Sequence, residues 1–268
     1  MQNSNELCPV LFIPHGGGPL PLLGDSNHQT LVGFLKEITP DLGIPSSILI
    51  ISAHWEEEIA TITSGKNPPL IYDYYGFPDQ AYAIEYPAVG NPELAEKIYD
   101  FLKADSIEAK LDDERGFDHG VFVPLKIMYP KANIPCMQLS LLNSLSSESH
   151  IKIGRALSKL RRENILIIGS GFSFHNMKAL MSGSAVEDHK NEQFEEWLIE
   201  TCTNPGLSAS ERETRLIDWI NAPFARYCHP REEHLLPLHI CMGMCESAAK
   251  LAFESYVAGK KTSAFLWH

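Results

Sequence analysis

Short, β-rich apolar runs alternate along the chain with stretches whose apolar residues recur at helical spacing, and this alternation constrains the fold more than any other feature. The apolar runs are bounded by Pro, Gly or Ser, as is typical of largely buried strands, and they cover 10–13, 46–52, 60–64, 134–141 and 164–170. The helical stripes cover 28–38, 92–104, 120–129, 147–161 and 188–202. We therefore predict an α/β fold with a mixed central β-sheet flanked by helices.

Local signals predict two further helices near the C-terminus. Ser210 and Glu213 have the spacing of a capping box and predict a helix that runs through Ile220. Pro237 fits the first turn of another helix. The apolar stripe of that helix would comprise Leu235, Leu238, Met242, Ala249 and Leu251.

The length of 268 residues suits one large domain or two small ones, and 44% hydrophobic with 21% charged residues is an ordinary globular balance. No repeat or low-complexity tract interrupts the chain, and the turn-rich stretch 65–90 fits an elaborated loop better than a linker. We therefore expect residues 1–268 to form a single catalytic domain.

The charge balance and the N-terminus restrict the partners. Thirty-four acidic against 22 basic residues give a net charge of −12, which argues against binding to nucleic acid or to an anionic membrane and favours a small-molecule ligand. The chain shows no basic segment followed by an apolar signal sequence and no apolar run of membrane-spanning length. A cytoplasmic location is expected.

The six cysteines are dispersed, and none forms a CxxC pair. Because they lie in or beside apolar stretches of a chain too large to need disulfides, we expect reduced thiols in the core.

Histidines follow three of the predicted strands. His15 follows 10–13, His54 follows 46–52, and His175 comes shortly after 164–170. Ligands of such sheets bind outside the carboxyl ends of the strands, so we expect these side chains to meet. His234 precedes the predicted helix at Pro237, where the positive end of the helix dipole favours the neutral imidazole that a metal needs, and His119 opens another helix.

The other histidines are assigned differently. His28, His150, His189 and His268 lie in polar sequence and are predicted to be surface residues. His239 is five residues beyond His234, roughly 140° around a helix, so both cannot face one metal and His239 is expected in the core or behind the site. The sequence does not place His229.

The HGGG sequence at 15–18 also occurs in the oxyanion-hole loop of lipase-type hydrolases. That function needs a GxSxG nucleophile, and the chain offers only GSGFS at 169–173. HExxH, Walker A and strand-associated GxGxxG motifs are absent as well. A scattered set of histidines suits a metal with open coordination positions, and the three glycines would leave His15 open to close approach.

Five ordered sequence blocks resemble one known family. The blocks PHGGGP, SAHWE, GFDHGVFVPL, IGSGFSFHNM and HPREEHLLPLHICMG look like the class III extradiol ring-cleavage dioxygenases, in the DOPA 4,5-dioxygenase-like branch of the LigB superfamily. The resemblance extends from residue 11 to about residue 255. It implies a single α/β domain, a non-haem Fe(II) centre, and insertion of O₂ into a catechol with opening of the ring.

The resemblance also implies roles for individual residues. His15 and His54 would bind the metal, His234 would complete the set, and His175 would be the acid–base residue beside it. Relatives of the protocatechuate type use a carboxylate as the third ligand, so Glu233 is the alternative to His234. His119 is a candidate hydrogen-bond partner of substrate or oxygen, and His175 is a candidate fourth ligand in a resting zinc form. The tyrosines of the 65–90 loop are candidates for covering the pocket: Tyr72, Tyr74 and Tyr75.

Fe(II) is therefore the expected working metal, and Zn(II) can replace it during purification because zinc binds more tightly to sites of this kind. Two other functions stay open, a catalytically silent Memo-like binding protein and a zinc-dependent hydrolase. The sequence leaves open the native catechol, the position of ring cleavage and whether the chain forms a homo-oligomer.

Overall fold

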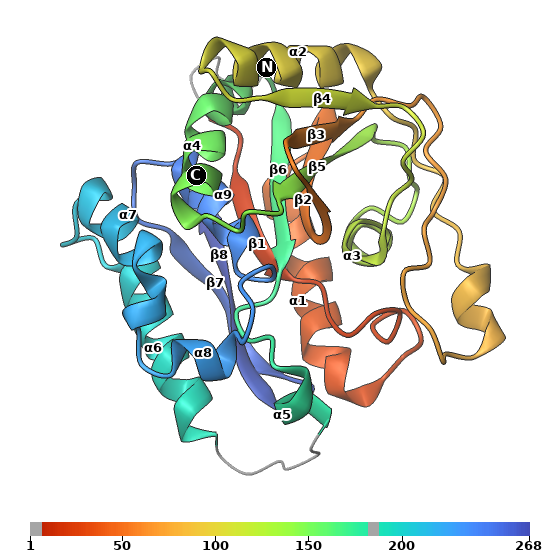
Figure 1. Ribbon diagram of the computed structural model, residues 1–268. Helices are drawn as coiled ribbons and strands as arrows, with labels where there is room; N and C mark the ends of the chain where they lie inside the picture. Colours follow the sequence, from red (N-terminus) through yellow and green to blue (C-terminus); the bar gives the residue numbers. More distant parts are fainter. Residues whose placement is uncertain (1–6, 182–187) are drawn as a thin grey trace.

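One eight-stranded sheet forms the centre of the protein, which is described by a computed structural model covering residues 7–181 and 188–268 (Figure 1). The strands are β1 (Val10–Pro14), β2 (Ser47–Glu57), β3 (Ala60–Thr63), β4 (Ala109–Asp112), β5 (Cys136–Leu142), β6 (Ile165–Gly171), β7 (Lys250–Val257) and β8 (Lys260–Trp267). Their order across the sheet is β4-β3-β5-β2-β6-β1-β8-β7.

The four central strands β5, β2, β6 and β1 are parallel, so their carboxyl ends meet at one edge. On one side β8 is antiparallel to β1 and β7 to β8, and on the other β3 pairs with β5 in the antiparallel sense and β4 runs parallel to β3. The sheet is mixed and flanked by helices, which confirms the predicted α/β class.

Helices cover both faces of the sheet (Figure 1). They are α1 (Gln29–Ile38), α2 (Pro92–Ala104), α3 (His119–Met128), α4 (Ser147–Leu157), α5 (Met177–Met181), α6 (His189–Thr203), α7 (Ala209–Ile217), α8 (Ala225–Cys228) and α9 (Leu236–Gly243). On one face α3 packs against β2 and β6, with α1 beside it. On the other, α9 packs against β1, β2 and β6, and it contacts α4 and α7. None of these helices, within the described ranges, is long and apolar enough to cross a membrane.

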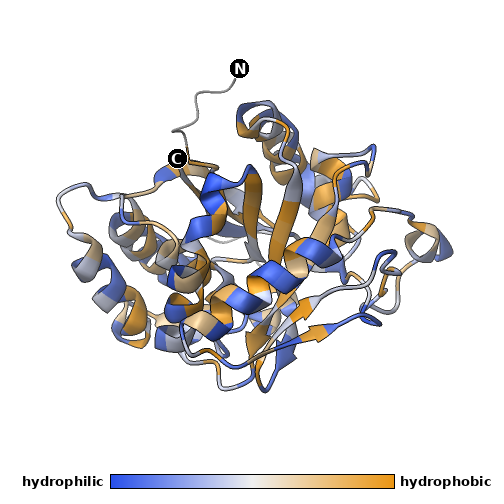
Figure 2. Cartoon of the chain, turned by 90° about the horizontal axis from the view of Figure 1, so that it is seen from above, coloured by the Kyte–Doolittle hydropathy of each residue, from blue (hydrophilic) through white to orange (hydrophobic). Residues whose placement is uncertain are grey.

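The central strands are buried on both faces, which explains their continuous apolar sequences. Every residue of β1 and β6 is buried. Figure 2 shows hydrophobic strands at the centre of the molecule and many hydrophilic residues on the helices around them. Five of the six cysteines are buried, Cys8 is half-buried, and all six are free thiols. The predicted core position is therefore correct for five cysteines and wrong for Cys8, which is only partly buried.

The predicted capping box is displaced by two residues. The helix N-cap is Ser208, whose hydroxyl accepts from the amide of Glu211 while the Glu211 carboxylate accepts from the Ser208 amide. Ser210 and Glu213 have the same spacing one half-turn later, so the sequence alone does not distinguish the two pairs. Helix α7 ends at Ile217, not at Ile220 as predicted.

The predicted helix beyond Pro237 is too long. Helix α9 ends at Gly243, and Leu251 lies in β7. Strands β7 and β8 form a hairpin whose turn residues, Ala258 and Gly259, both have positive φ, a combination that matches the right-handed twist of paired strands. The sequence pattern predicts no hairpin at this position.

Two histidines predicted at the surface are buried. The Nδ1 of His28 lies 2.7 Å from Asp25 Oδ1, and its Nε2 accepts from the amide of Gly17. His150 bonds the carbonyl of Ser146 and accepts from an amide at the end of β5. Both imidazoles connect loop or helix backbone that would otherwise lack partners, a role that polar neighbours in the sequence do not reveal.

Candidate metal centre

Five histidines from separate parts of the chain meet at the carboxyl edge of the central strands. His15 directly follows β1, and His175 lies four residues beyond β6. His54 lies inside β2, because this strand continues to Glu57 and does not end at residue 52 as predicted. His119 is the first residue of α3, and His234 lies two residues before α9.

The imidazole rings form one continuous cluster. The ring of His15 lies 4.8 Å from that of His54 and 5.3 Å from that of His234, and the rings of His54 and His234 are 5.0 Å apart. His119 lies 3.9 Å from His54, and His175 stacks on His234 at 3.4 Å. The structure therefore brings together all five of the histidines singled out in the sequence.

A hydroxyl fixes the orientation of His15. The Ser170 hydroxyl donates its proton to the carbonyl of Gly120, and its oxygen lies 3.1 Å from Nδ1 of His15. The oxygen must then accept a hydrogen bond from Nδ1–H, which places the lone pair of the neutral imidazole on Nε2. His15 is only 2% exposed, so the three glycines after it do not leave the ring open as expected.

Two carboxylates lie beside the remaining rings, and they form hydrogen bonds with His234, His175 and His119. Glu233 Oε1 lies 2.9 Å from Nδ1 of His234 and 3.1 Å from Nδ1 of His175. Asp73 Oδ1 lies 2.8 Å from Nδ1 of His119, and Asp73 Oδ2 lies 3.6 Å from Nδ1 of His54. Carboxylates behind imidazoles are a common arrangement at metal sites, where they fix the tautomer and raise the basicity of the ligand.

The electrostatics keep the central imidazoles neutral. Burial, together with the neighbouring histidines, holds the pKa of His15 and of His54 well below the ordinary value. Burial also lowers the pKa of His234 to about 4, against the opposing effect of Glu233. Because a metal binds the neutral ring, these shifts favour metal binding at neutral pH.

The donor atoms fit a metal ion. The Nε2 atoms of His15 and His54 are 3.1 Å apart. Two imidazoles that share a metal at about 2.1 Å hold their nitrogens roughly 3.0–3.4 Å apart, so this separation needs no rearrangement. His15, His54 and His119 offer ligand atoms within 4.8 Å of one another, and His175, Glu233 and His234 form a second group of this kind.

Two glycines allow the segments that carry the histidines to pack closely against each other. A Cβ on Gly171, at the end of β6, would lie 2.2 Å from the carbonyl oxygen of His234. A Cβ on Gly120 would lie 2.4 Å from Ser52 Oγ and 3.2 Å from the ring of His54. These two positions leave no space for a side chain, so they set the distance between the strands and the histidine segments.

The three tyrosines named as candidates for covering the pocket lie in different environments. The ring of Tyr74 is buried 5.9 Å from His119, whereas Tyr75 is 92% exposed and Tyr72 packs against Phe122. The tyrosine loop also carries Asp73, which the sequence analysis missed. Its carboxylate lies in a loop without a recognisable motif, and only the fold brings it to His119.

The family model for the catalytic LigB subunit of aromatic ring-opening dioxygenase matches residues 9–265. A dioxygenase of Hapsidospora irregularis, tasH, is 38% identical over 270 residues, which cover 91% of this chain and 80% of that protein. The 4,5-DOPA dioxygenase extradiol of Beta vulgaris is 35% identical over 265 residues and covers 97% of this chain and 96% of its own length. The Escherichia coli protein of the same description is 32% identical over 242 residues, with 90% and 86% covered.

Among solved structures, the crystal structure of an uncharacterised protein of Escherichia coli K12 superposes with a TM-score of 0.77 and 27% sequence identity. The match covers 97% of this chain and the whole of that one. From the family match over nearly its full length and from these relatives, the chain belongs to the LigB family and is an extradiol aromatic ring-opening dioxygenase.

Proposed function

We propose that the protein is an Fe(II)-dependent dioxygenase that opens the ring of a catechol with O₂. One observation carries this proposal most directly: the Nδ1 atoms of His15 and His234 are held by Ser170 and Glu233, which leaves their Nε2 lone pairs free for a metal, and Nε2 of His54 lies 3.1 Å from Nε2 of His15. The relatives described as 4,5-DOPA dioxygenases make DOPA the first catechol to test.

His15, His54 and His234 are the proposed ligands. Three neutral imidazoles leave about half of an octahedral shell open, which is what a metal needs when it must hold both a diol and O₂. When bound, Fe(II) supplies the redox chemistry that lets O₂ react with an aromatic ring. Glu233 is better suited to orient His234 than to replace it, because its Oε1 already accepts from His234 and His175.

His175 is the proposed acid–base residue. Its side chain is 22% exposed, so it can reach substrate, and it stacks on His234 beside the ligand set. Its Nδ1 faces Glu233, which leaves Nε2 to take a proton from a catechol hydroxyl and to return a proton later in the reaction. The Glu233 carboxylate would stabilise the imidazolium that exists between these two transfers.

His119 is proposed to hold the substrate. Its Nδ1–H donates to Asp73, so its Nε2 is an acceptor that can receive a hydrogen bond from a catechol hydroxyl. The neighbouring Tyr74 donates its own hydroxyl proton to the carbonyl of Ala81 and so serves as an apolar wall.

The test is anaerobic loading with Fe(II), followed by a panel of catechols under air. We expect O₂ uptake and a yellow semialdehyde product with at least one catechol, DOPA first. A colourless muconate product would show cleavage between the two hydroxyls and would contradict the proposed regiochemistry. No uptake over the whole panel, with iron bound, would favour a Memo-like binding protein, and ester or amide hydrolysis by the zinc form would favour a hydrolase.

A further inference from the structure

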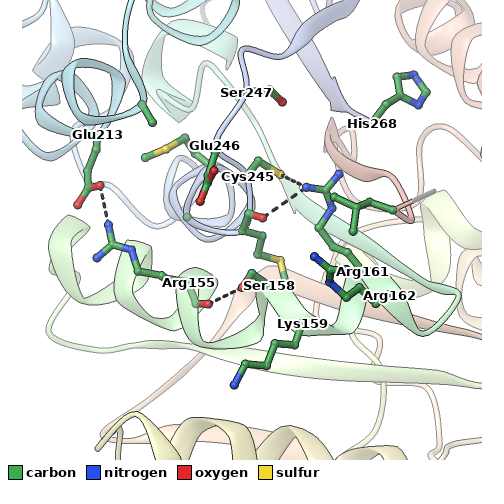
Figure 3. Close-up of a pocket in the computed structure, with 15 residues that line it drawn as sticks. Arg155, Ser158, Lys159, Arg161, Arg162, Glu213, Cys245, Glu246, Ser247 and His268 are labelled. Atoms are coloured by element: carbon green, nitrogen blue, oxygen red, sulfur yellow. Dashed lines mark hydrogen bonds and ion pairs between the residues drawn. The ribbon is translucent and has the colours of Figure 1, made fainter. Parts of the chain in front are cut away.

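A cavity of about 900 Å³, drawn in Figure 3, is lined by residues next to the amino end of β6, away from the five clustered histidines. Its walls are formed by the end of α4, the 3₁₀ helix Ser158–Arg162 that leads into the amino end of β6, and the turn after α9. The histidines lie beyond the carboxyl end of the same strand β6, so the two sites are separate.

This cavity is basic in a protein of net charge −12. The segment 155–162 contains four cationic residues and no acidic one, and all four line the cavity: Arg155, Lys159, Arg161 and Arg162. Arg155 pairs with Glu213, on the left in Figure 3, whereas Lys159 and Arg162 have no carboxylate partner among the described residues. The other acidic residue in the lining is Glu246.

Arg161 gives the cavity a buried donor. The residue is only 4% exposed, and its Nε donates to the carbonyl of Cys8 while Nη1 lies 3.5 Å from the carbonyl of Met244 and 3.4 Å from Cys245 Sγ. Its Nη2 is buried and has no hydrogen-bond partner in the described part of the chain. A buried charged donor without a partner costs free energy, and such atoms commonly mark the position of a water molecule or ligand oxygen.

We propose that this cavity binds a small polyanion, with Arg161 at its wall and Arg162 and Lys159 supplying further positive charge. Guanidinium groups bind phosphate and carboxylate oxygens through paired N–H donors, and within the described ranges only Arg155 of the four cationic residues is paired with a carboxylate. The volume is sufficient for a molecule with several anionic groups, such as a phosphate ester or a polycarboxylate. The inference does not depend on the function proposed for the histidine centre.

The test is isothermal titration of the full-length protein with inorganic pyrophosphate and, separately, with citrate, at constant ionic strength. We expect saturable binding of one pyrophosphate per chain, weakened about tenfold or more in Arg162→Gln. The charge-matched control is Lys36→Gln, which removes an exposed cation at the end of α1, outside the cavity. Binding of pyrophosphate alone would identify a phosphate site, and equal binding of citrate would identify a general polyanion site.

Arg161→Lys removes the unpartnered Nη2 and should also weaken binding. Because Arg161 holds Cys8 and Met244 in place, this variant can lose stability, and Arg162→Gln keeps the test independent of that loss. Pyrophosphate chelates metals, so the titration is repeated with His54→Ala, in which the proposed metal centre is incomplete. Three results would each overturn the proposal. The first is loss of the heat of pyrophosphate binding in His54→Ala, and the second is equal affinity in Arg162→Gln and Lys36→Gln. The third is the absence of saturable binding of either anion.

Discussion

Glu233 shares one carboxylate oxygen between two imidazoles, at 2.9 Å from Nδ1 of His234 and 3.1 Å from Nδ1 of His175. The same oxygen therefore orients a proposed metal ligand and the proposed acid–base residue, whose rings stack at 3.4 Å. The hydrogen bonds from these histidines hold the pKa of Glu233 far below its ordinary value, although burial opposes them. The carboxylate is therefore ionised whenever the enzyme is folded near neutral pH.

Glu233→Gln should reduce both metal affinity and turnover. The amide keeps one acceptor but loses the negative charge, and loss of such a partner behind a ligand costs about 10- to 100-fold in affinity or activity. Chelator competition and steady-state kinetics measure the two effects. Glu232→Gln is the control, because Glu232 pairs with Arg226 and forms no hydrogen bond or ion pair with the five clustered histidines in the described ranges. Equal behaviour of the two variants would show that Glu233 has no such role.

His15→Ala and His54→Ala should each lose the metal. We expect about one divalent metal per chain in the wild-type protein, and removal of one of three ligands leaves an incomplete shell. Metal analysis after dialysis gives the stoichiometry. His189→Ala, which changes an exposed histidine at the start of α6, should retain the full metal content. Full retention in His15→Ala and His54→Ala as well would exclude these residues as ligands.

His175→Ala should be mainly a kinetic variant. A fourth permanent ligand would occupy a position that substrate or O₂ needs, so we expect near-normal Fe(II) content and catechol binding with kcat lowered on the order of 10²- to 10⁴-fold. Anaerobic catechol titration and single-turnover kinetics separate binding from chemistry. If the variant loses iron as completely as His54→Ala does, His175 is a ligand, and His119 becomes the next candidate for proton transfer.

The four central strands and β3 could be predicted because they are continuous apolar runs, whereas β4, β7 and β8 could not. His15, His54 and His175 could be predicted because they lie at or near the ends of the predicted runs, and His119 and His234 because they lie beside predicted helix starts. The residues that form hydrogen bonds with these histidines could not be predicted. Asp73 and Ser170 acquire their roles only when distant segments pack together, and a serine or aspartate in isolation is compatible with any surface loop. The same reason explains the errors at His28 and His150, whose Nε2 atoms accept from the backbone amides of Gly17 and Leu142.

A buried carboxyl group should make stability depend on pH. Glu195 in α6 is fully buried; Ser263 donates to its Oε2, and its Oε1 has no partner in the described ranges. Burial raises the pKa of Glu195 to about 7, against hydrogen bonds from Ser173 and Ser263. Between the ordinary pKa of 4.5 and about 7 the folded state holds a proton that the unfolded chain has lost. This contribution to the free energy of unfolding therefore falls as pH rises through that window, by on the order of 3 kcal/mol.

Glu195→Gln should remove this dependence. Urea unfolding at pH 5 and pH 8 is expected to show that the stability of the variant, relative to wild type, improves at the higher pH. Glu196→Gln, at the neighbouring exposed position, should show no such change. A constant difference between wild type and Glu195→Gln at both pH values would contradict the raised pKa.

Gly171→Ala should damage the proposed metal centre without removing a proposed ligand. Its new Cβ would lie 2.2 Å from the carbonyl oxygen of His234 and 3.2 Å from the carbonyl carbon, and backbone atoms cannot move aside as a flexible side chain can. The His234 segment must therefore shift away from β6, and we expect a loss of about 1–3 kcal/mol in stability together with weaker metal binding. Gly33→Ala is the matched control, because Gly33 lies in α1 with no neighbour within 4 Å of the added carbon. That substitution should stabilise the helix by roughly 0.5–1 kcal/mol and leave metal affinity unchanged. Retained metal affinity in Gly171→Ala would show that the position of His234 does not depend on this contact.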